Sequence, residues 1–296
     1  MRYVPLKRAI LKWEDPYTDR RYFVKLFKAA DAARAVCNFT QVNNAFERGE
    51  LGFMVPQPVA YNARCHALLM TEVPGQSFTD LMHACRPDAF AEAGRILAQL
   101  HSSYISPETR WTPDRELAIL QRHMQGVKRV LPELAPQLDH LIANLEHRSQ
   151  ELCFPLDAPI HGNLFGDQIL YGREGIGVVD WDALALGDPL YDVGRLLAHL
   201  LYVAGRQTLN ATAPSAATRC SDSLLSAYES ESGQPVDWPR LTWHVATQLL
   251  LRGKISSLRQ LPERWQRHLV FAVTEAARVF DGQSPFLRLP VSLEHA

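Results

Sequence analysis

The spacing of hydrophobic and polar positions changes near residue 75 of the chain. Before that point, apolar residues alternate with polar ones or form short runs rich in aromatic and β-branched residues, which is typical of strands. Strands are therefore expected over residues 3–13 and 22–27, and two more within residues 56–75, the second of them over residues 67–73. Residues 29–46 have helical spacing instead. Pro74-Gly75 is a turn signal that ends this part, which predicts a small sheet-containing unit followed by a larger one.

After Pro74-Gly75, the apolar positions recur at helical spacing. Two amphipathic segments are marked by Phe78, Leu81 and Met82, and then by Phe90, Ala93, Leu97 and Leu100. Further helices are expected over residues 116–127, 138–152, 193–203, 221–229, 239–258 and 262–280. The whole pattern predicts an α+β protein with a small sheet and a large, mainly helical part.

Residues 159–194, PIHGNLFGDQILYGREGIGVVDWDALALGDPLYDVG, interrupt the helical pattern. Two short apolar runs flank the turn residues 172–175, which predicts a β-hairpin. With a three-residue loop that ends at Gly175 in the left-handed conformation, Gln168 lies opposite Asp180. Directly opposed side chains on one face of a hairpin lie within about 5 Å of each other. The pattern therefore places an amide oxygen beside a carboxylate at one end of the hairpin.

One carboxylate and one amide oxygen suit a hard cation such as Mg²⁺, which keeps several waters and takes its other ligands from a phosphate. Five aspartates crowd the segment against one arginine, Arg173, a density that a cation would compensate. They are Asp167, Asp180, Asp182, Asp188 and Asp192. The alternative is a turn-rich surface loop, where aspartate is common because its side chain hydrogen-bonds nearby backbone.

The overall composition restricts function only slightly. The chain has 296 residues, 47% of them hydrophobic and 21% charged, which is ordinary for a globular protein. A net charge of −1 gives no reason to expect nucleic acid or an anionic membrane as a partner. No apolar run is long enough to span a bilayer, and no signal peptide is indicated. The five scattered cysteines predict reduced, buried thiols in a cytoplasmic protein.

The segments HGNLFGDQIL and VVDWDALALGDPLYDVG resemble the catalytic and metal-binding segments of the aminoglycoside phosphotransferase family, also called the phosphotransferase enzyme family. That family carries H-G-D-x-x-x-x-N, I-D-W-x and G-D-P-x-x-D on a protein-kinase-like fold. The resemblance implies a two-lobed fold, with an antiparallel-sheet N-lobe over residues 1–74 and a helical C-lobe over residues 75–296. It also implies an ATP- and Mg²⁺-dependent phosphotransferase that acts on a hydroxyl of a small molecule.

The same resemblance assigns roles within the motifs. Asp180 and Gln168 correspond to the two metal ligands, and Asp192 to a buried aspartate that braces the catalytic loop. His161 is expected to brace the loop rather than to react.

Two positions depart from the family motif. Asn163 stands where the family has its catalytic aspartate, and Gln168 stands where it has a metal-binding asparagine. Glutamine keeps the amide oxygen on a longer side chain, which allows metal binding with altered geometry. Asparagine can orient a hydroxyl but cannot take its proton, and a general base contributes roughly 10² to 10⁴ in rate. Asp167 is the candidate for a substitute base.

In the N-lobe, Lys25 is expected to hold the nucleotide phosphates, with Lys28 as the competing candidate. A helix glutamate, Glu47 or Glu50, would reach back toward it. The resemblance further implies an adenine-binding linker, formed by Met70, Thr71, Glu72 and Val73.

The loop that covers phosphates in such folds is often rich in glycine, but residues 1–25 contain none. Either a different loop covers the phosphates, or the N-lobe is truncated, or the coding sequence begins upstream of Met1.

Two functions follow from these observations. The first is the small-molecule phosphotransferase. The second is a kinase-fold protein that has lost catalysis and binds a nucleotide or a partner. Asp180 favours the first, whereas Asn163, Gln168 and the short N-terminus favour the second. A polycationic acceptor would need an acidic wall, for which Glu229, Glu231 and Asp237 are the candidates, although such carboxylates are usually only solvated.

Overall fold

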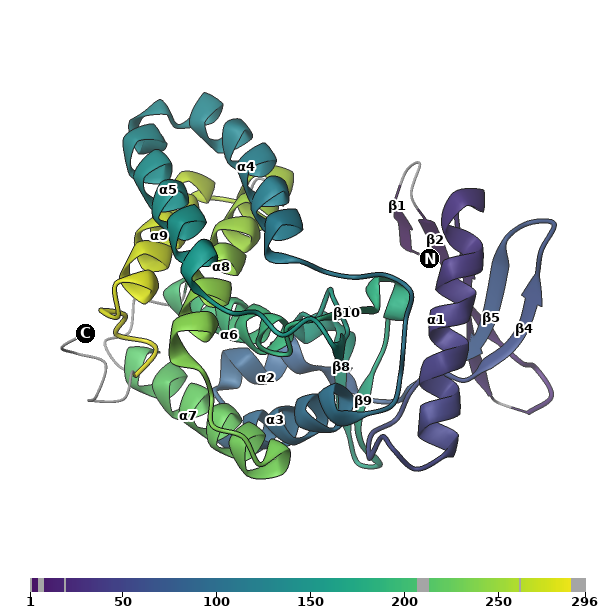
Figure 1. Cartoon of the computed structure of the whole chain (residues 1–296). Coiled ribbons are helices and arrows are strands. Elements are labelled where there is room, and N and C mark those ends of the chain that lie inside the picture. The colour runs from purple at the N-terminus through teal and green to yellow at the C-terminus, as the bar shows by residue number, and fades with distance from the viewer. Residues whose placement is uncertain (1, 5–7, 19, 207–212, 261, 289–296) are drawn as a thin grey trace.

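The chain folds into two lobes, as its hydropathy pattern predicts. The computed structural model describes residues 2–4, 8–18, 20–206, 213–260 and 262–288. Figure 1 shows a small lobe, made of strands β1 to β5 and helix α1, beside a larger lobe that holds helices α2 to α9. Short strands β6 to β10 belong to the larger lobe, and β8 and β9 face the junction.

The small lobe is a five-stranded antiparallel sheet with α1 (Ala29–Glu47) packed beside it. The strand order is β1-β2-β3-β5-β4, with bounds Arg2–Val4, Arg8–Glu14, Arg21–Leu26, Ala67–Thr71 and Pro58–Asn62, respectively. The strand expected over residues 3–13 is therefore two strands, β1 and β2. Their connection, where a phosphate-covering loop would lie, is residues 5–7, which are outside the described residues.

The larger lobe contains every helix that the hydropathy pattern predicts after Pro74-Gly75. The helices are α2 (Phe78–Ala84), α3 (Pro87–Ser102), α4 (Pro113–Val130), α5 (Ala135–Glu151), α6 (Leu190–Arg206), α7 (Ala213–Ser232), α8 (Trp238–Gln260) and α9 (Trp265–Phe280). Two of them start at a proline, Pro87 and Pro113, because the fixed φ of proline suits the first helical turn. None of the described helices is both long and apolar enough to cross a membrane.

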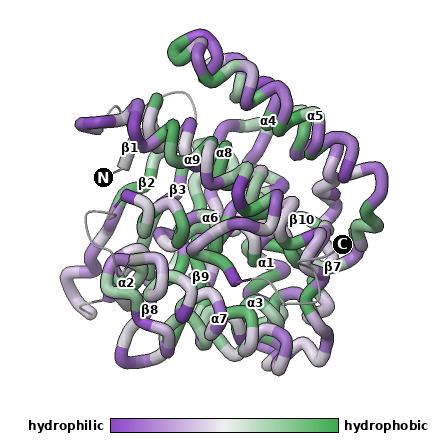
Figure 2. Tube along the Cα trace, turned by 90° about the vertical axis from the view of Figure 1, so that its left-hand side faces the viewer, coloured by the Kyte–Doolittle hydropathy of each residue, from purple (hydrophilic) through white to green (hydrophobic). Residues whose placement is uncertain are grey.

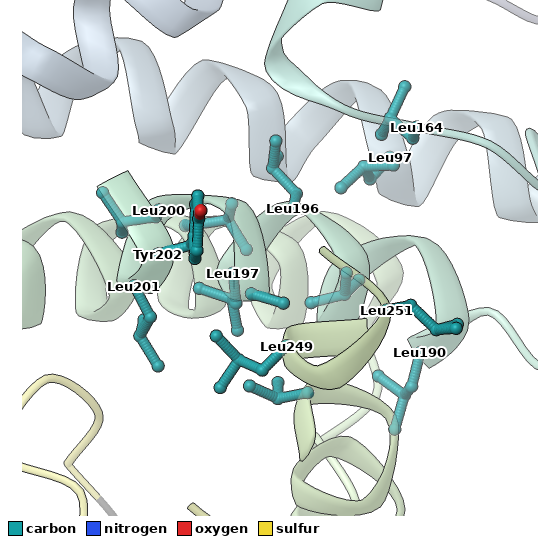
Figure 3. Close-up of a cluster of buried hydrophobic side chains, with 14 of the residues drawn as sticks. Leu97, Leu164, Leu190, Leu196, Leu197, Leu200, Leu201, Tyr202, Leu249 and Leu251 are labelled. Carbon is teal, nitrogen blue, oxygen red and sulfur yellow. The ribbon is translucent and has the colours of Figure 1, made fainter. Parts of the chain in front are cut away.

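The core of the larger lobe forms around α6, of which every residue from Leu190 to Gly205 is buried. Leucines from α3, α6 and α8 gather there (Figure 3), together with Leu164 from the segment before the hairpin. Figure 2 colours the chain by hydropathy and shows hydrophobic residues concentrated on the inner helices. The cysteine prediction was partly wrong, because Cys37, Cys65 and Cys153 are exposed.

The predicted hairpin is present as β8 (Ile169–Gly172) and β9 (Gly175–Val178), but its register differs by one residue. Gly172 pairs directly with Gly175, so the loop has two residues rather than three. Gln168 consequently lies outside the ladder, at the end of a short 3₁₀ helix, and its carbonyl accepts a hydrogen bond from Val179 N–H at 2.9 Å. Asp180 is therefore one residue beyond the position opposite Gln168.

The hairpin also connects the two lobes. Met54 precedes β4; its N–H donates to Ile176 O and its carbonyl accepts from Val178 N–H, both at 2.9 Å. Gly177 permits this approach, because a Cβ there would lie 2.4 Å from a methyl of Val73. On its other side, β8 pairs with the two-residue strand β6 (Gln76–Ser77), which directly follows Gly75. The hairpin is thus bonded both to Met54 of the small lobe and to the start of the large lobe.

Candidate active site

A cavity of about 320 Å³ lies between the small sheet and the hairpin. It brings together eight of the residues that the sequence predicts for the site: Lys25, Met70, Thr71, Glu72, Val73, Asp167, Gln168 and Asp180. The sequence analysis did not name six of its apolar residues, which are Ile10, Phe23, Phe39, Pro56, Leu170 and Val179. The sheet and linker therefore give the cavity mainly apolar walls with two charged residues, Lys25 and Glu72, and the hairpin side adds the carboxylates of Asp167 and Asp180.

Lys25 is the cation of this cavity. Its position on β3 is buried, with 3% of the side chain exposed, and its Nζ lies 2.5 Å from Asp180 Oδ1 and 2.6 Å from Asp182 Oδ1. The rings of Phe27 and Phe39 lie 5.4 and 5.5 Å from the same nitrogen. One ammonium is thus held between two carboxylates from the segment after the hairpin. Of the two, Asp182 was missed as a site residue, although its spacing from Asp180 was visible in the sequence DWD.

The predicted helix partner of Lys25 was wrong. Phe39 is the α1 residue that faces Lys25, and Glu47 lies eight residues further along, or roughly 12 Å at 1.5 Å per residue. Glu47 instead accepts a hydrogen bond from Asn43 at 2.9 Å. The alternative, Glu50, pairs with Arg48. The carboxylate expected from the helix is supplied by Asp182.

Asp180 has an unusual backbone conformation. Its φ of 75° and ψ of 52° are left-handed, a region that costs roughly 1–2 kcal/mol for residues other than glycine and is best tolerated by Asn and Asp. The following residue, Trp181, is fully buried and donates its indole N–H to Val178 O at 3.1 Å. The Trp181 anchor therefore holds the turn that directs Asp180 toward Lys25. Strain of this kind is commonly found at functional sites.

The loop that carries the His161 motif is fixed by one buried carboxylate. Asp192 accepts hydrogen bonds from the backbone N–H groups of His161, at 2.5 Å, and Gly162, at 3.1 Å. Burial would raise the pKa of Asp192, but the hydrogen bond and charge of His101 hold it below its usual value. Gly162 needs to be glycine, because its φ is +75° and a Cβ would lie 2.2 Å from Ala183 O.

His161 itself lies inside this loop and is fully buried. Its Nε2 lies 3.0 Å from Val179 O, which can only accept, so the proton is on Nε2. Its Nδ1 then accepts from Asn163 N–H at 3.3 Å. Burial lowers the pKa of His161, which keeps the ring neutral. Each ring nitrogen is therefore occupied by the backbone, which is the geometry of a brace.

Asn163, Asp167 and Gln168 occupy different places around the loop. Asn163 Oδ1 accepts from a terminal nitrogen of Arg195, on α6, at 2.8 Å. Asp167 is exposed at the mouth of the cavity, and its Oδ1 accepts from the Thr79 hydroxyl at 2.7 Å. Gln168 Oε1 accepts from Phe165 N–H at 2.8 Å, which leaves one lone pair of that oxygen for another partner.

Behind the loop, a second network holds the start of α6. Asp188 accepts from Leu190 N–H at 2.9 Å and pairs with Arg240 at 3.0 Å. His244 lies between Asp188 and Glu116, at 3.5 and 3.2 Å. Burial would lower the pKa of His244, but the two carboxylates raise it to about 9. The buried imidazole is therefore charged at neutral pH.

The donor set of the cavity fits a divalent cation that is shared with phosphates. Asp180 and Gln168 both line it, and Lys25 shows that a positive charge is stable between Asp180 and Asp182. Among the described residues, no cluster of three or more histidine, cysteine, aspartate or glutamate side chains could hold a metal alone. A cation here would take its remaining ligands from water and phosphate, as Mg²⁺ usually does.

The predicted adenine linker lines the opposite side of the cavity. Two of its N–H groups are already used within the sheet, since Thr71 donates to Gln57 O and Glu72 to Arg21 O, both at 3.0 Å. The carboxylate of Glu72 also pairs with Arg21, at 2.8 Å. The linker is therefore well fixed, and an adenine at this edge would have to hydrogen-bond to backbone groups of the linker other than these two N–H groups.

Comparison with known proteins agrees with this geometry. The family described as the phosphotransferase enzyme family matches residues 11–241. Among solved structures, a choline/ethanolamine kinase family protein from Mesorhizobium loti is 16% identical, with a TM-score of 0.60 and coverage of 92% of this chain and 88% of that one. A thermostable mutant of aminoglycoside phosphotransferase APH(4)-Ia is 15% identical, with a TM-score of 0.63 and coverage of 95% and 92%.

A third structure is amicoumacin kinase hAmiN in complex with AMP-PNP, Ca²⁺ and Ami, which is 13% identical, with a TM-score of 0.61 and coverage of 97% and 89%. These likenesses confirm the predicted two-lobed, protein-kinase-like fold. No curated protein sequence matches the chain.

Proposed function

Because the chain belongs to the phosphotransferase enzyme family, we propose that it is an ATP- and Mg²⁺-dependent phosphotransferase that acts on a hydroxyl group of a small molecule. The observation that carries this proposal is the cation held in the cavity between the lobes. Lys25 and the carboxylates of Asp180 and Asp182 place paired positive and negative groups where a metal–triphosphate complex needs both.

The proposed roles follow from the positions of the side chains. Asp180 and Gln168 hold the metal ion, which neutralises charge on the phosphates when it is bound. Lys25 then turns from the carboxylates to the phosphates. The linker residues Met70, Thr71, Glu72 and Val73 receive the adenine.

On the acceptor side, Asn163 or Asp167 orients the hydroxyl. His161 and Asp192 keep the loop in place without reacting, as their hydrogen bonds to the backbone suggest.

Asn163 sets the expected rate. An amide cannot remove the acceptor proton, and a general base is worth roughly 10² to 10⁴ in rate. Phosphoryl transfer mostly proceeds through a loose transition state, in which positioning and charge neutralisation dominate. We therefore propose slow transfer, with Asp167, a carboxylate of the same loop, as the candidate for a substitute base.

A second candidate function is favoured by one contact. Arg195 donates to Asn163 Oδ1 at 2.8 Å, so one of the two lone pairs of this oxygen is already occupied. A protein with this loop could bind the nucleotide without transferring phosphate and serve as a nucleotide- or partner-binding module. The cytoplasmic location, the lobe boundary at Pro74-Gly75, and the expectation of no nucleic-acid or membrane partner stay predictions.

Calorimetry of ATP binding, with and without Mg²⁺, tests the metal site. The variant is Asp180→Asn, because asparagine tolerates the left-handed backbone of this position and removes the charge. The exposed Asp157→Asn is the matched control. We expect Mg²⁺ to raise ATP affinity about tenfold or more in the wild type and the control, and not in Asp180→Asn. An ATP affinity that Mg²⁺ leaves unchanged in the wild type would refute the proposal.

ADP release over a panel of hydroxylated compounds separates the two candidate functions. Acceptor-dependent release supports the phosphotransferase, whereas Mg²⁺-dependent ATP binding without release supports the binding module. Measuring Asn163→Asp beside the wild type guards against an incomplete panel. ADP release by the Asn163→Asp variant would show that the panel contains a usable acceptor.

A further inference from the structure

Two arginines enclose one aromatic ring of the loop beside Asn163. Arg195 on α6 and Arg252 on α8 lie against the ring of Phe165, with guanidinium carbons 4.0 and 4.7 Å from its centre. We call Arg195, Phe165 and Arg252 the arginine stack. It places two positive charges within about 9 Å of each other, on the loop that carries Asn163.

The partners of Arg195 in the stack are all neutral. Its terminal nitrogens donate to Asn163 Oδ1 at 2.8 Å, to the Tyr191 hydroxyl at 3.0 Å and to Gln248 Oε1 at 2.5 Å. Within the part of the chain that the structure describes, no carboxylate forms an ion pair with Arg195 or Arg252. An aspartate at position 163 would neutralise one of these charges, but asparagine does not.

Arg252 also faces a group that cannot accept its hydrogen bond. His199 Nδ1 accepts from Gly166 N–H at 3.0 Å, so the proton of the neutral ring is on Nε2. That nitrogen lies 2.6 Å from a terminal nitrogen of Arg252, and both are donors. Burial, and then the charge of Arg252, strongly lower the pKa of His199, so the ring stays neutral and keeps its single acceptor, Nδ1. The contact between His199 and Arg252 therefore joins two hydrogen-bond donors and lacks an acceptor.

The pKa of Arg252 reflects both its burial and the surrounding charges. Burial is the main cause that lowers the pKa of Arg252 to about 10, and the charges of Arg195 and Arg206 contribute to a smaller extent. The charge of Asp167 opposes this shift more strongly than either arginine favours it, and Asp167 Oδ1 accepts from the Thr79 hydroxyl at 2.7 Å. The positive charge at the stack is therefore only partly compensated.

The stack reaches the surface next to the site of transfer. Asn163, Phe165 and Arg252 are half-buried, and Asp167 beside them is exposed. We propose that the arginine stack binds an anionic group of the acceptor, so that the acceptor is a hydroxyl compound that carries a carboxylate or a phosphate. A planar guanidinium matches both anions with paired hydrogen bonds. This inference rests on the proposed function and specifies its substrate class.

The acidic residues that a cationic acceptor would need have other roles. Glu229 accepts from Val236 N–H at 2.8 Å, and Glu231 accepts from Gln99 at 3.0 Å. Asp237 pairs with Arg240 at 3.0 Å. The carboxylates that the sequence suggested as an acidic wall therefore stabilise local structure instead, which favours an anionic acceptor over a polycationic one.

Calorimetry on the full chain, saturated with ADP and Mg²⁺ at fixed ionic strength, tests the stack. The probes are glycerol 3-phosphate, glycerate, glycerol and choline, which are a phosphate, a carboxylate, a neutral compound and a cation. We expect one or both anions to bind more tightly than glycerol and choline. Which anion binds tells whether the group is a phosphate or a carboxylate.

Variants of Arg252 link the binding to the stack. Arg252→Gln is expected to weaken anion binding about tenfold or more, because charge-assisted hydrogen bonds are lost. Arg252→Lys should restore part of it, and the exposed Arg122→Gln on α4 should change nothing. Absence of anion binding, equal binding of choline, or an affinity unaffected by Arg252→Gln would overturn the inference.

The same titrations without nucleotide separate this inference from the proposed function. If the protein does not bind ADP but still binds the anion in a way that depends on Arg252, the anion site is supported and the phosphotransferase is refuted.

Discussion

Removal of the positive charge at Lys25 should lower the free energy of unfolding of the ligand-free protein, and Mg²⁺ should restore part of it. Lys25→Met keeps an unbranched side chain that is one atom shorter and deletes the ammonium. The oxygens of Asp180 and Asp182 lie 2.5 and 2.6 Å from Nζ, so they are no more than about 5 Å apart. Without the ammonium, two carboxylates face each other at that distance with no cation between them.

The magnitude follows from Coulomb's law. Two charges about 5 Å apart at an effective dielectric constant near 20 repel each other by roughly 3 kcal/mol. The carboxylates are 13% and 27% exposed, so water relieves part of that energy. We therefore expect Lys25→Met to lower the free energy of unfolding by about 2–3 kcal/mol, less than the ~3–5 kcal/mol typical of a fully buried pair.

Urea unfolding with and without 10 mM Mg²⁺ measures both effects. A cation that binds with a Kd near 1 mM would stabilise the variant by about 1.4 kcal/mol. The wild type should gain less, because Mg²⁺ must displace Lys25. The control is Lys12→Met on β2, whose pair with Glu14 at 3.1 Å is exposed and should contribute less than about 1 kcal/mol. Equal stabilisation of Lys25→Met and wild type by Mg²⁺ would refute the reasoning.

Three further changes test other parts of the site. Asn163→Asp supplies a proton acceptor whose pKa Arg195 would lower, so ADP release should rise about 10²-fold; an unchanged rate would exclude a missing base as the cause of slow transfer. Gly162→Ala puts a Cβ 2.2 Å from a backbone oxygen and should lose more than about 2 kcal/mol in urea unfolding, whereas Gly126→Ala in open space on α4 should gain about 1 kcal/mol. The pKa of His244 is raised to about 9 in the folded state. Its contribution to the free energy of unfolding is therefore complete below pH 6.5 and is lost as the pH rises through 9. Unfolding free energy should fall over that range by up to about 3 kcal/mol, and His244→Gln should flatten the curve.

The sequence predicted those parts of the fold that depend on local signals. In helices α3 to α9, apolar residues recur at helical spacing over several turns, and the turn residues 172–175 predict the hairpin. The motif around His161 located the loop, and Lys25 and Asp180 were correctly expected to line one site. These features are encoded in neighbouring residues or in short motifs, so a single sequence contains them.

The errors concern distances between elements that the sequence does not encode locally. Glu47 was placed near Lys25 because the helix was predicted, but not which of its turns faces the strand. The hairpin register was wrong by one residue because two- and three-residue loops both suit a glycine-flanked turn. Arg252 was missed because it reaches Phe165 from a helix far along the chain. Each error is a question of tertiary packing.

The contact between Met54 and the hairpin attaches the small lobe to the large one besides the linker at Gly75. Helix α1 adds a further attachment, because the side chain of Asn38 donates to Trp181 O at 3.2 Å. These two attachments lie on either side of Asp180 in the chain. The segment that carries Asp180 is therefore tied to the same lobe as Lys25, and the lysine–aspartate pair should stay aligned when the helical part of the large lobe moves.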